Sequence, residues 1–369
     1  MKGTIRARGR DTWQLVYDLP PGPDGKRKQK TETVRGPKKV AQIRLREVLG
    51  AVDKGLVADP GKMTVGQYLD EWYAVATGSN GTLSRHESII RLYIKPAIGN
   101  VRLTLLTALH IEGMYQGETL KRLSASTVRQ THVTLGKALG RAVKLGLIQR
   151  NPCRDIETLP KTSHHAVRFL SPAEKGRFLV AAKETRHFPI IMAALCTGMR
   201  LGELRGLKWE DVDLDSGIIR VRRSADRFNK ISESLKTPKS RRTIAIPSAL
   251  IDALRQHHQY LLEEKMRLRP IWQDLGLVFP RPDGGVLGIT VMQKPFNMMC
   301  EKAGVSVSFH SLRHTHASDL IAANIHPKVI SERLGHSNIA TTMDRYGHLF
   351  PGAQDAAALA IDAAIREAM

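Results

Sequence analysis

The sequence contains few of the residues that build disulfide frameworks or thiolate metal sites. Its 369 residues include three cysteines, Cys153, Cys196 and Cys300, which lie far apart and outside any C-x-x-C pair. An odd number of cysteines at such spacing supports neither a disulfide framework nor a zinc site. The histidines are not accompanied by a carboxylate cluster at the spacing of metal ligands. We therefore expect small buried cysteines and no metal or other cofactor.

Long apolar runs and nucleotide-binding loops are missing as well. No run of roughly 18 or more apolar residues occurs, and the N-terminus lacks the apolar core of a signal peptide. These absences predict a cytoplasmic protein without a membrane segment. The sequence also has no G-x-x-x-x-G-K-S/T loop, which argues against a reaction driven by ATP.

Acidic residues are too few to balance the basic ones. The 57 lysines and arginines stand against 35 aspartates and glutamates, a net charge of +22, and 42% of the residues are hydrophobic. That hydrophobic content is too high for a disordered polycation, and the length suggests two or three domains. Because the basic excess extends over residues 1–62, 63–160 and 161–369, each part could attract nucleic acid.

The first segment has the alternation of a small sheet followed by a helix. Strands are predicted within residues 5–8, 13–17 and 28–34, with a turn-rich stretch at 20–25. A helix is predicted over 38–49. Its expected buried positions are Val40, Ile43 and Val48.

A basic cluster lies at the start of the third predicted strand. Its members are Lys26, Arg27, Lys28 and Lys30. Such a cluster can be an ordinary solvated hairpin or a contact with DNA. The charge of the whole chain favours DNA.

The middle segment, residues 64–157, has helical periodicity throughout and predicts a bundle. Its last helix should start near Ser126 and stop at Gly146. The apolar residues expected on its buried side are Val133, Leu135, Ala138, Leu139, Ala142 and Val143. Residues 158–168 read as an exposed linker.

The last segment predicts a mainly helical domain with a short sheet. Helices are expected at 172–183 and 188–197, strands at 218–221 and 243–246, and further helices to the C-terminus. A capping box from Ser171 to Glu174 supports the first helix start. The predicted fold class is therefore multidomain and mainly α, with small β elements.

Two patches in this last segment carry charged residues at helical spacing. Arg200 and Glu203 are three residues apart after a Thr-Gly helix break, on one face of the next helix. His310 and Arg313 have the same spacing at a helix start, where backbone N–H groups also favour an anion. Either pair taken alone is more often structural.

A basic loop and a tyrosine near the C-terminus complete the candidate set. The basic residues at the tip and return of the expected hairpin are Lys236, Lys239, Arg241 and Arg242. They could contact a nucleic-acid backbone or form a plain basic turn. His336 follows further along the chain, ten residues before Tyr346.

The ordered set Arg200, Lys236, His310-x-x-Arg313, His336 and Tyr346 resembles the tyrosine recombinase (phage integrase) family. The similarity is strongest over roughly 169–350, within an expected catalytic domain at 169–369. Residues 64–157 resemble the helical core-binding domain of the family. Residues 1–55 resemble the small arm-type DNA-binding domain of integrases that use accessory sites.

This resemblance implies a site-specific recombinase that cleaves and rejoins double-stranded DNA. Tyr346 would be the nucleophile of a 3′-phosphotyrosyl intermediate, and Arg200 and Arg313 would stabilise charge on the phosphoryl oxygens. Lys236 would protonate the leaving 5′-oxygen, and His310 would help to deprotonate the tyrosine.

The remaining implied roles concern support and assembly. His336 would hydrogen-bond the phosphate, and Glu203 would orient the cationic cluster. The bond energy stays in the protein, so rejoining needs neither ATP nor a metal. The family also implies a homotetramer on paired core-type sites, arm-type DNA sites, and a role in integrating or excising a mobile element. The resemblance leaves open whether a host DNA-bending protein or an excision factor is needed.

Two other functions compete with this interpretation. Residues 329–343 resemble a helix-turn-helix, which would suit a non-catalytic DNA-binding regulator. A type IB topoisomerase-like enzyme would share the phosphotyrosine chemistry. A separate question concerns the apolar tail helix predicted at 353–369, which could pack on its own domain or dock on a neighbouring protomer.

Overall fold

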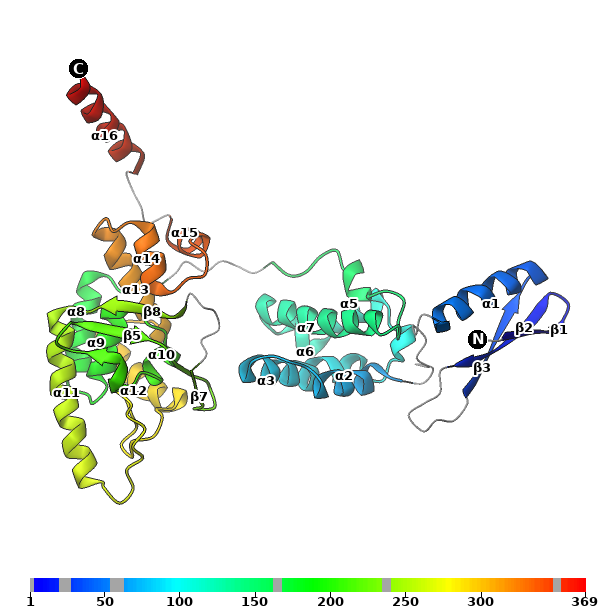
Figure 1. The fold of residues 1–369 in the computed structure, drawn as a ribbon, viewed down its shortest axis with the longest axis horizontal. Helices are drawn as coiled ribbons and strands as arrows, with labels where there is room; N and C mark the ends of the chain where they lie inside the picture. The colour runs from blue at the N-terminus through cyan, green and yellow to red at the C-terminus, as the bar shows by residue number, and fades with distance from the viewer. Residues whose placement is uncertain (1–2, 20–27, 54–62, 162–167, 234–239, 348–352) are drawn as a thin grey trace. The chain divides into compact units, whose positions relative to one another are not determined.

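The computed structural model describes residues 3–19, 28–53, 63–161, 168–233, 240–347 and 353–369 (Figure 1). The chain divides into two compact units, Met1–His164 and His165–Met369. The mainly helical fold with small sheets agrees with the fold class expected from the sequence. The predicted domain limits of 1–55, 64–157 and 169–369 stay predictions.

The N-terminal residues form an antiparallel sheet with one helix on it. Strands β1 (Gly3–Gly9), β2 (Thr12–Leu19) and β3 (Lys28–Arg35) lie in that order, and α1 covers Lys38–Asp53. Leu15 and Tyr17 of β2 pack against Ala41 and Val48 of α1. The predicted turn at 20–25 lies outside the described residues.

The buried face of α1 agrees with the prediction at Val48, which is 8% exposed, and differs at two other positions. Val40 and Ile43 are 44% and 48% exposed, whereas Ala41 is fully buried and Leu45 packs with Val48 on the sheet. Two apolar stripes overlap in this helix. The stripe with the small residue Ala41 lies against the sheet, because a short side chain allows the helix to approach closely.

A helical block with its own core follows. Its elements are α2 (Val65–Ala74), α3 (Asn80–Ile89), η1 (Ile90–Ile94), α4 (Lys95–Ile98), η2 (Leu103–Leu105), α5 (Ala108–Gln116), α6 (Glu118–Lys121), α7 (Ala125–Lys144) and η3 (Pro152–Asp155). The hydroxyl of Tyr68 donates to the carbonyl of Ala138 over 2.6 Å and so ties α2 to α7.

The expected helix at 126–146 is α7, with two corrections. It begins at Ala125 after the N-cap Ser124, whose hydroxyl accepts from the backbone N–H of Thr127. Val133, predicted to be buried, is 62% exposed, whereas the neighbouring Leu135 is fully buried. The core of this block is filled from the stripe that contains Leu135, which lies on another side of the helix.

The unit that starts at His165 is built around a second, larger core. It comprises α8 (Pro172–Lys183), α9 (Phe188–Thr197), α10 (Leu201–Arg205), η4 (Trp209–Asp211), α11 (Ser248–Arg267), α12 (Ile289–Ala303), α13 (Phe309–Ala322), α14 (Pro327–Leu334), α15 (Ala340–Tyr346) and α16 (Ala353–Ala368). The helices predicted at 172–183 and 188–197 are confirmed, as is the capping box of Ser171 and Glu174.

The short sheets of this unit refine the predicted hairpin. Strands β4 (Val212–Asp213), β5 (Ile218–Val221) and β8 (Arg242–Ala245) form one antiparallel sheet, in which Ile219 pairs with Ile244. A separate two-stranded hairpin, β6 (Ser224–Ala225) and β7 (Ile231–Ser232), lies between β5 and β8 in the sequence. The sheet positions the start of β8 near α10 and α14.

A small satellite core lies at the end of the segment that closes with α15. Tyr346 of α15 packs with Ala317 and Ile321 of α13 and with Ile330 and Leu334 of α14. Helices α13 and α14 therefore hold the tyrosine of α15 in place.

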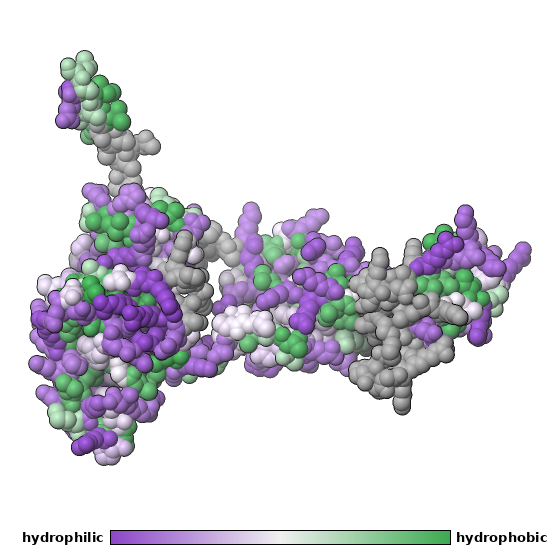
Figure 2. All heavy atoms as spheres, viewed as in Figure 1, coloured by the Kyte–Doolittle hydropathy of each residue, from purple (hydrophilic) through white to green (hydrophobic). Residues whose placement is uncertain are grey.

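Several sequence expectations concern exposure. Cys153 and Cys300 are buried free thiols, and Cys196 is partly buried and also free. Apolar residues cover much of α16 in Figure 2, and Leu359 and Ile365 are 71% and 55% exposed. Within the described ranges, no helix is both long and apolar enough to cross a membrane.

Candidate active site

The chain reverses direction at a glycine immediately before the first candidate residue. Helix α9 ends at Gly198, whose φ is +64°. A Cβ atom there would lie 2.6 Å from the His316 ring and 2.8 Å from the Leu334 side chain. Both the left-handed backbone and the close packing therefore require glycine. The turn places Arg200 at the N-cap of α10.

A single carboxylate organises two arginines at this turn. Glu203 accepts a hydrogen bond from the backbone N–H of Arg200 over 3.0 Å and from Nη1 of Arg200 over 2.9 Å. It also accepts from Nη2 of Arg242 over 2.9 Å. Burial raises the pKa of Glu203, but Arg242 and then Arg200 outweigh burial and hold the pKa below its usual value. The carboxylate is therefore ionised, as the predicted orienting group would be.

Arg242 lies in a different environment from the one expected of a DNA-contacting side chain. Its side chain is 6% exposed, and its Nε donates to the carbonyl of Arg333 over 2.7 Å. Arg241, beside it, is exposed and donates to the carbonyl of Glu233 over 3.3 Å. Arg242 is the first residue of β8 and pairs with the buried Glu203, whereas Arg241 precedes the strand.

Arg313 is a buried cation held by backbone oxygens. It is 3% exposed, and it donates from Nη1 to the carbonyl of Gly198 over 2.7 Å and from Nη2 to that of Leu334 over 2.6 Å. Burial and then the neighbouring Arg200 lower its pKa to about 9. A bound anion beside Arg313 would stabilise this buried positive charge.

Tyr346 is enclosed, and the ring that contacts its hydroxyl is His314. The tyrosine is 1% exposed, and Nδ1 of His314 lies 2.5 Å from its Oη. Burial raises the pKa of Tyr346, while Arg313 and Arg345 act in the opposite direction. Sequence reasoning missed His314. Its position one turn after His310 on the same helix face was the available signal.

His310 lies at the exposed side of this group. Its ring meets the edge of the His314 ring, with centroids 4.8 Å apart. Although the residue is exposed to solvent, partial desolvation by the surrounding protein, followed by Arg313, Arg345 and Arg200, lowers its pKa to about 4. The ring is therefore neutral near neutral pH.

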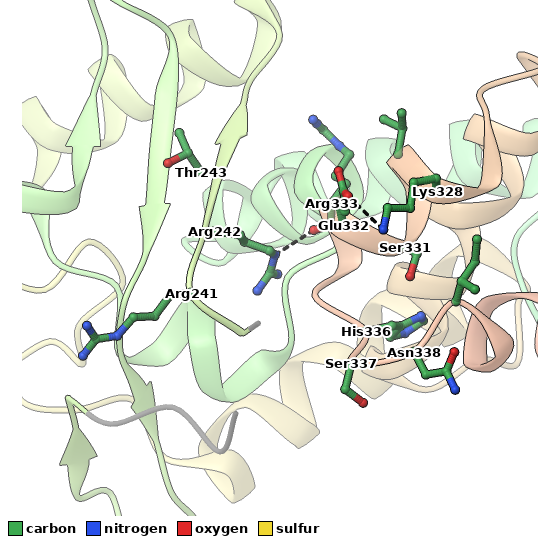
Figure 3. A pocket seen from close by; sticks show the side chains of 12 residues that line it. Arg241, Arg242, Thr243, Lys328, Ser331, Glu332, Arg333, His336, Ser337 and Asn338 are labelled. Carbon is green, nitrogen blue, oxygen red and sulfur yellow. Dashed lines mark hydrogen bonds and ion pairs between the residues drawn. The ribbon is translucent and has the colours of Figure 1, made fainter. Parts of the chain in front are cut away.

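His336 borders an open groove of about 810 Å³ (Figure 3). Its Nδ1 lies 2.8 Å from Oγ1 of the buried Thr342, and it follows Gly335, whose φ is +66°. Burial and then Arg313 and Arg200 lower its pKa to about 3. In Figure 3 one wall of the groove comes from the start of β8 and the other from α14 and the turn after it.

The remaining predicted residues divide between described and undescribed parts of the chain. Lys236 and Lys239 lie outside the described residues, as do Lys26 and Arg27. Lys28 and Lys30 belong to β3, where they pair in register with Leu19 and Tyr17. Among the described residues, no group of three or more His, Cys, Asp and Glu side chains could hold a metal ion.

The structure thus brings five of the six predicted catalytic residues together. Arg200 reaches the carbonyl of Gly335 over 3.4 Å, next to His336, and Arg313 binds the carbonyl of Leu334 on the other side of the same glycine. His310 and Tyr346 join them through His314. Cationic donors therefore converge beside a tyrosine hydroxyl.

Residues 162–352 match the phage integrase family, and residues 64–118 match the phage integrase N-terminal SAM-like domain. The chain belongs to the phage integrase family. This confirms the resemblance that the sequence motifs indicated, and it makes the chain a tyrosine-type site-specific recombinase. The alternative interpretation of the chain as a non-catalytic DNA-binding regulator is thereby excluded.

Relatives of this integrase-family chain span most of its length. A tyrosine recombinase XerC-like protein of Caldanaerobacter subterraneus subsp. tengcongensis is 29% identical over 338 residues, which cover 85% of this chain and 86% of the relative. An integrase of Streptomyces ambofaciens is 28% identical and covers 91% of this chain and 89% of its own length.

Solved structures show the same fold at lower identity. The integrase of transposon Tn1549 in complex with a circular intermediate DNA is 21% identical, with a TM-score of 0.66, over 77% of this chain and 95% of that one. A lambda integrase dimer bound to a COC′ core site is 19% identical, with a TM-score of 0.58, over 93% and 95% of the two chains.

The helix-turn-helix pattern has a structural explanation in this family member. Helices α14 and α15 flank Gly335, and the turn supplies the carbonyls that bind Arg200 and Arg313. Leu334 and Tyr346, one from each helix, belong to the same small core. The segment therefore supports the candidate site.

Proposed function

We propose that this recombinase cleaves and rejoins DNA through a 3′-phosphotyrosyl intermediate, and that it thereby integrates or excises a mobile element. The observation that carries the proposal is the incompletely neutralised positive charge around Tyr346. Arg313 is buried on backbone carbonyls, and the carboxylate of Glu203 is shared between Arg200 and Arg242. A phosphodiester would supply the missing negative charge beside the nucleophile.

The electrostatics favour a bound phosphate in particular. Positive neighbours contribute to the lowered pKa of His310, of His336 and of Arg313. Three neighbouring side chains thus lie in an environment of excess positive charge. Such an environment favours the binding of an anion. Arg200, with a 40% exposed side chain, could reach a bound duplex.

The proposed reaction is a direct displacement at phosphorus. Tyr346 Oη loses its proton with the help of His310 and forms a bond to phosphorus, and the bond from phosphorus to the 5′-oxygen breaks. Arg200 and Arg313 stabilise charge on the non-bridging oxygens, and His336 hydrogen-bonds the phosphate. Lys236 gives a proton to the leaving 5′-oxygen. Attack by another 5′-hydroxyl reverses the step and joins new partners without ATP or a metal.

The proposed DNA contacts extend beyond this site. Structural neighbours of the chain include integrases solved with DNA. We infer that residues 64–157 contact core-type sites and that residues 1–55, with Lys28 and Lys30 on β3, contact arm-type sites. Four copies would assemble on two paired sites, and a DNA-bending host protein or an excision factor could assist.

Trapping the covalent adduct tests this function directly. The full chain is incubated with fragmented genomic DNA, denatured, and the attached DNA is sequenced. We expect recurrent sequences attached to the wild type and none attached to the Tyr346→Phe variant, which should still bind DNA. An adduct that persists in Tyr346→Phe would disprove the nucleophile, and loss of the adduct in EDTA would disprove the metal-independent mechanism.

A second assay separates recombination from topoisomerase activity. Two plasmids carrying the recovered sequence are incubated with the protein, and the products are resolved by size. Recombinant joints are expected. Relaxed circles without joints would instead identify a type IB topoisomerase-like enzyme.

A further inference from the structure

The tyrosine hydroxyl has a histidine partner that is not among the residues assigned above. Nδ1 of His314 lies 2.5 Å from Oη of Tyr346, and the two ring centroids are 5.7 Å apart. With a proton on its Nε2, His314 accepts the tyrosine hydrogen bond through the Nδ1 lone pair. The nearest described acceptor for the proton of the proposed nucleophile is therefore this imidazole.

The ring lies between the buried tyrosine and the exposed end of helix α13. Tyr346 is 1% exposed, His314 is half-buried, and His310 is exposed. His310 meets His314 edge-on at 4.8 Å between centroids. His314 thus links an enclosed hydroxyl to the side of the site that faces solvent.

Charged neighbours keep the lone pair of His314 available. Burial first, and then His310 and Arg313 of α13 and Arg345 of α15, lower the pKa of His314 to about 4. The ring is consequently neutral at neutral pH. A phosphodiester bound by the arginines would offset their charge and make His314 a stronger base, so that proton transfer would be less unfavourable when DNA is present.

We propose that His314 is a catalytic residue that accepts the proton of Tyr346 during DNA cleavage and returns it during rejoining. This inference rests on the proposed role of Tyr346 as the nucleophile. In cleavage the Oη–phosphorus bond forms, the phosphorus–5′-oxygen bond breaks, and the proton of Oη moves to Nδ1 of His314. In rejoining the tyrosine oxygen leaves phosphorus and takes the proton back from the imidazolium.

The test uses three variants of the full chain on the DNA recovered by adduct trapping. His314→Phe keeps a ring but loses the acceptor, and His314→Asn keeps a hydrogen-bonding group but cannot take a proton near neutral pH. Single-turnover adduct formation should slow by about 10²–10⁴-fold in both, with DNA binding unchanged. His336→Asn is the matched control, because that histidine contacts Thr342 and not the tyrosine oxygen.

A more acidic nucleophile distinguishes proton transfer from positioning. Each protein is also made with a fluorinated tyrosine at position 346, whose phenol ionises at lower pH. Fluorination should raise the rate of adduct formation at least tenfold in His314→Phe and in His314→Asn. It should raise the rate of His336→Asn only slightly. A near-wild-type rate in His314→Asn, or equal rescue of all three variants, would overturn the proposal.

The fluorine nucleus gives a readout that does not depend on DNA cleavage. The resonance of the fluorinated tyrosine in the free protein should shift when His314 becomes Phe, because the hydrogen bond is lost. An unchanged resonance would contradict the contact. If the wild type forms no adduct with any DNA, the proposed function fails, while this spectrum still decides whether His314 accepts a hydrogen bond from the tyrosine hydroxyl.

Discussion

Glu203 and Arg242 form an ion pair that is nearly closed to solvent. Nη2 of Arg242 lies 2.9 Å from Oε2 of Glu203, and the two side chains are 6% and 3% exposed for Arg242 and Glu203 respectively. The same carboxylate holds Arg200 at the start of α10. This pair therefore links the backbone of β8 to the helix that presents Arg200.

Removing the charge of Glu203 should cost both stability and cleavage. Glu203→Gln leaves Arg242 buried without its counter-charge, and we expect a loss of about 2–4 kcal/mol in the free energy of unfolding. Glu233→Gln is the control, because that carboxylate is 78% exposed in its pair with Arg223 and should matter by less than about 0.5 kcal/mol. Urea unfolding measures the stability of the two variants, and adduct formation measures their cleavage. Equal losses in the two variants would refute the role of the buried pair.

The two proposed phosphate-binding arginines should separate catalysis from folding. Arg200→Ala removes a 40% exposed side chain, so cleavage should fall by about 10²–10³-fold with little change in stability. Arg313→Ala should reduce cleavage similarly and also destabilise the fold, because it leaves the carbonyls of Gly198 and Leu334 without a donor. Adduct formation and thermal melting report the two effects. Arg313→Ala with wild-type melting would contradict this division.

Gly198 and Gly304 offer a matched pair for testing the turn before Arg200. Both have a φ of +64°, but a Cβ at Gly198 would meet His316 at 2.6 Å, whereas one at Gly304 meets nothing within 4 Å. Gly304→Ala should cost about 1–2 kcal/mol for the left-handed backbone alone. Gly198→Ala should cost more, on the order of 3 kcal/mol, since the clash is added. Similar costs would show that the turn can relax.

Local signals in the sequence predicted the ends of elements better than their buried faces. Pro172 after the N-cap Ser171, and Gly198 after α9, fix helix limits through backbone chemistry that acts within a few residues. The exposed positions of Val40 and Val133 depend instead on which of several apolar stripes meets another element. That choice is made by tertiary packing.

In the candidate site, too, the sequence predicted some features and not others. The order and spacing of Arg200, Arg313 and Tyr346 carried the resemblance to the phage integrase family, and that resemblance led to the proposed displacement at phosphorus. The contact between His314 and Tyr346 joins residues 32 positions apart, and the burial of Arg242 depends on Glu203 in another element. The helical spacing of His310 and His314 places both on one face but does not reveal the contact with Tyr346, and no periodic pattern marks the pair of Arg242 and Glu203.

Acid should destabilise the unit that starts at His165. Burial lowers the pKa of His257 and of His316 to about 4. The unfolded chain therefore binds more protons between about pH 6.5 and 4, so stability is full above that window and is lost as the pH falls through it. Each histidine should lower the free energy of unfolding by about 2 kcal/mol at pH 5, relative to neutral pH.

A substitution at one of these histidines tests the cause. His257 donates from Nε2 to the carbonyl of Val278 over 2.7 Å, and His257→Gln can keep that donor without a titrating ring. The melting temperature of this variant should fall less than that of the wild type between pH 7 and pH 5. An equal fall would assign the acid sensitivity to other groups.

The C-terminal helix α16 should matter for assembly more than for folding. Its described side chains are exposed, with Leu359, Ile361 and Ile365 at 71%, 62% and 55%. Truncation after Gly352 should leave melting and DNA binding nearly unchanged, because little buried area is lost. A helix whose described apolar side chains are exposed suits a groove on a neighbouring protomer. We therefore expect weaker tetramer formation on paired sites and less recombination.

A double variant on the helix sharpens this last test. Ile361→Glu with Ile365→Glu places charge on two positions one turn apart and should reproduce the truncation, whereas Glu367→Gln on the same helix should behave as wild type. Size analysis of complexes on paired DNA sites and the adduct assay report assembly and cleavage separately. Tetramers and recombination at wild-type levels in the truncated protein would show that α16 has no part in joining the subunits.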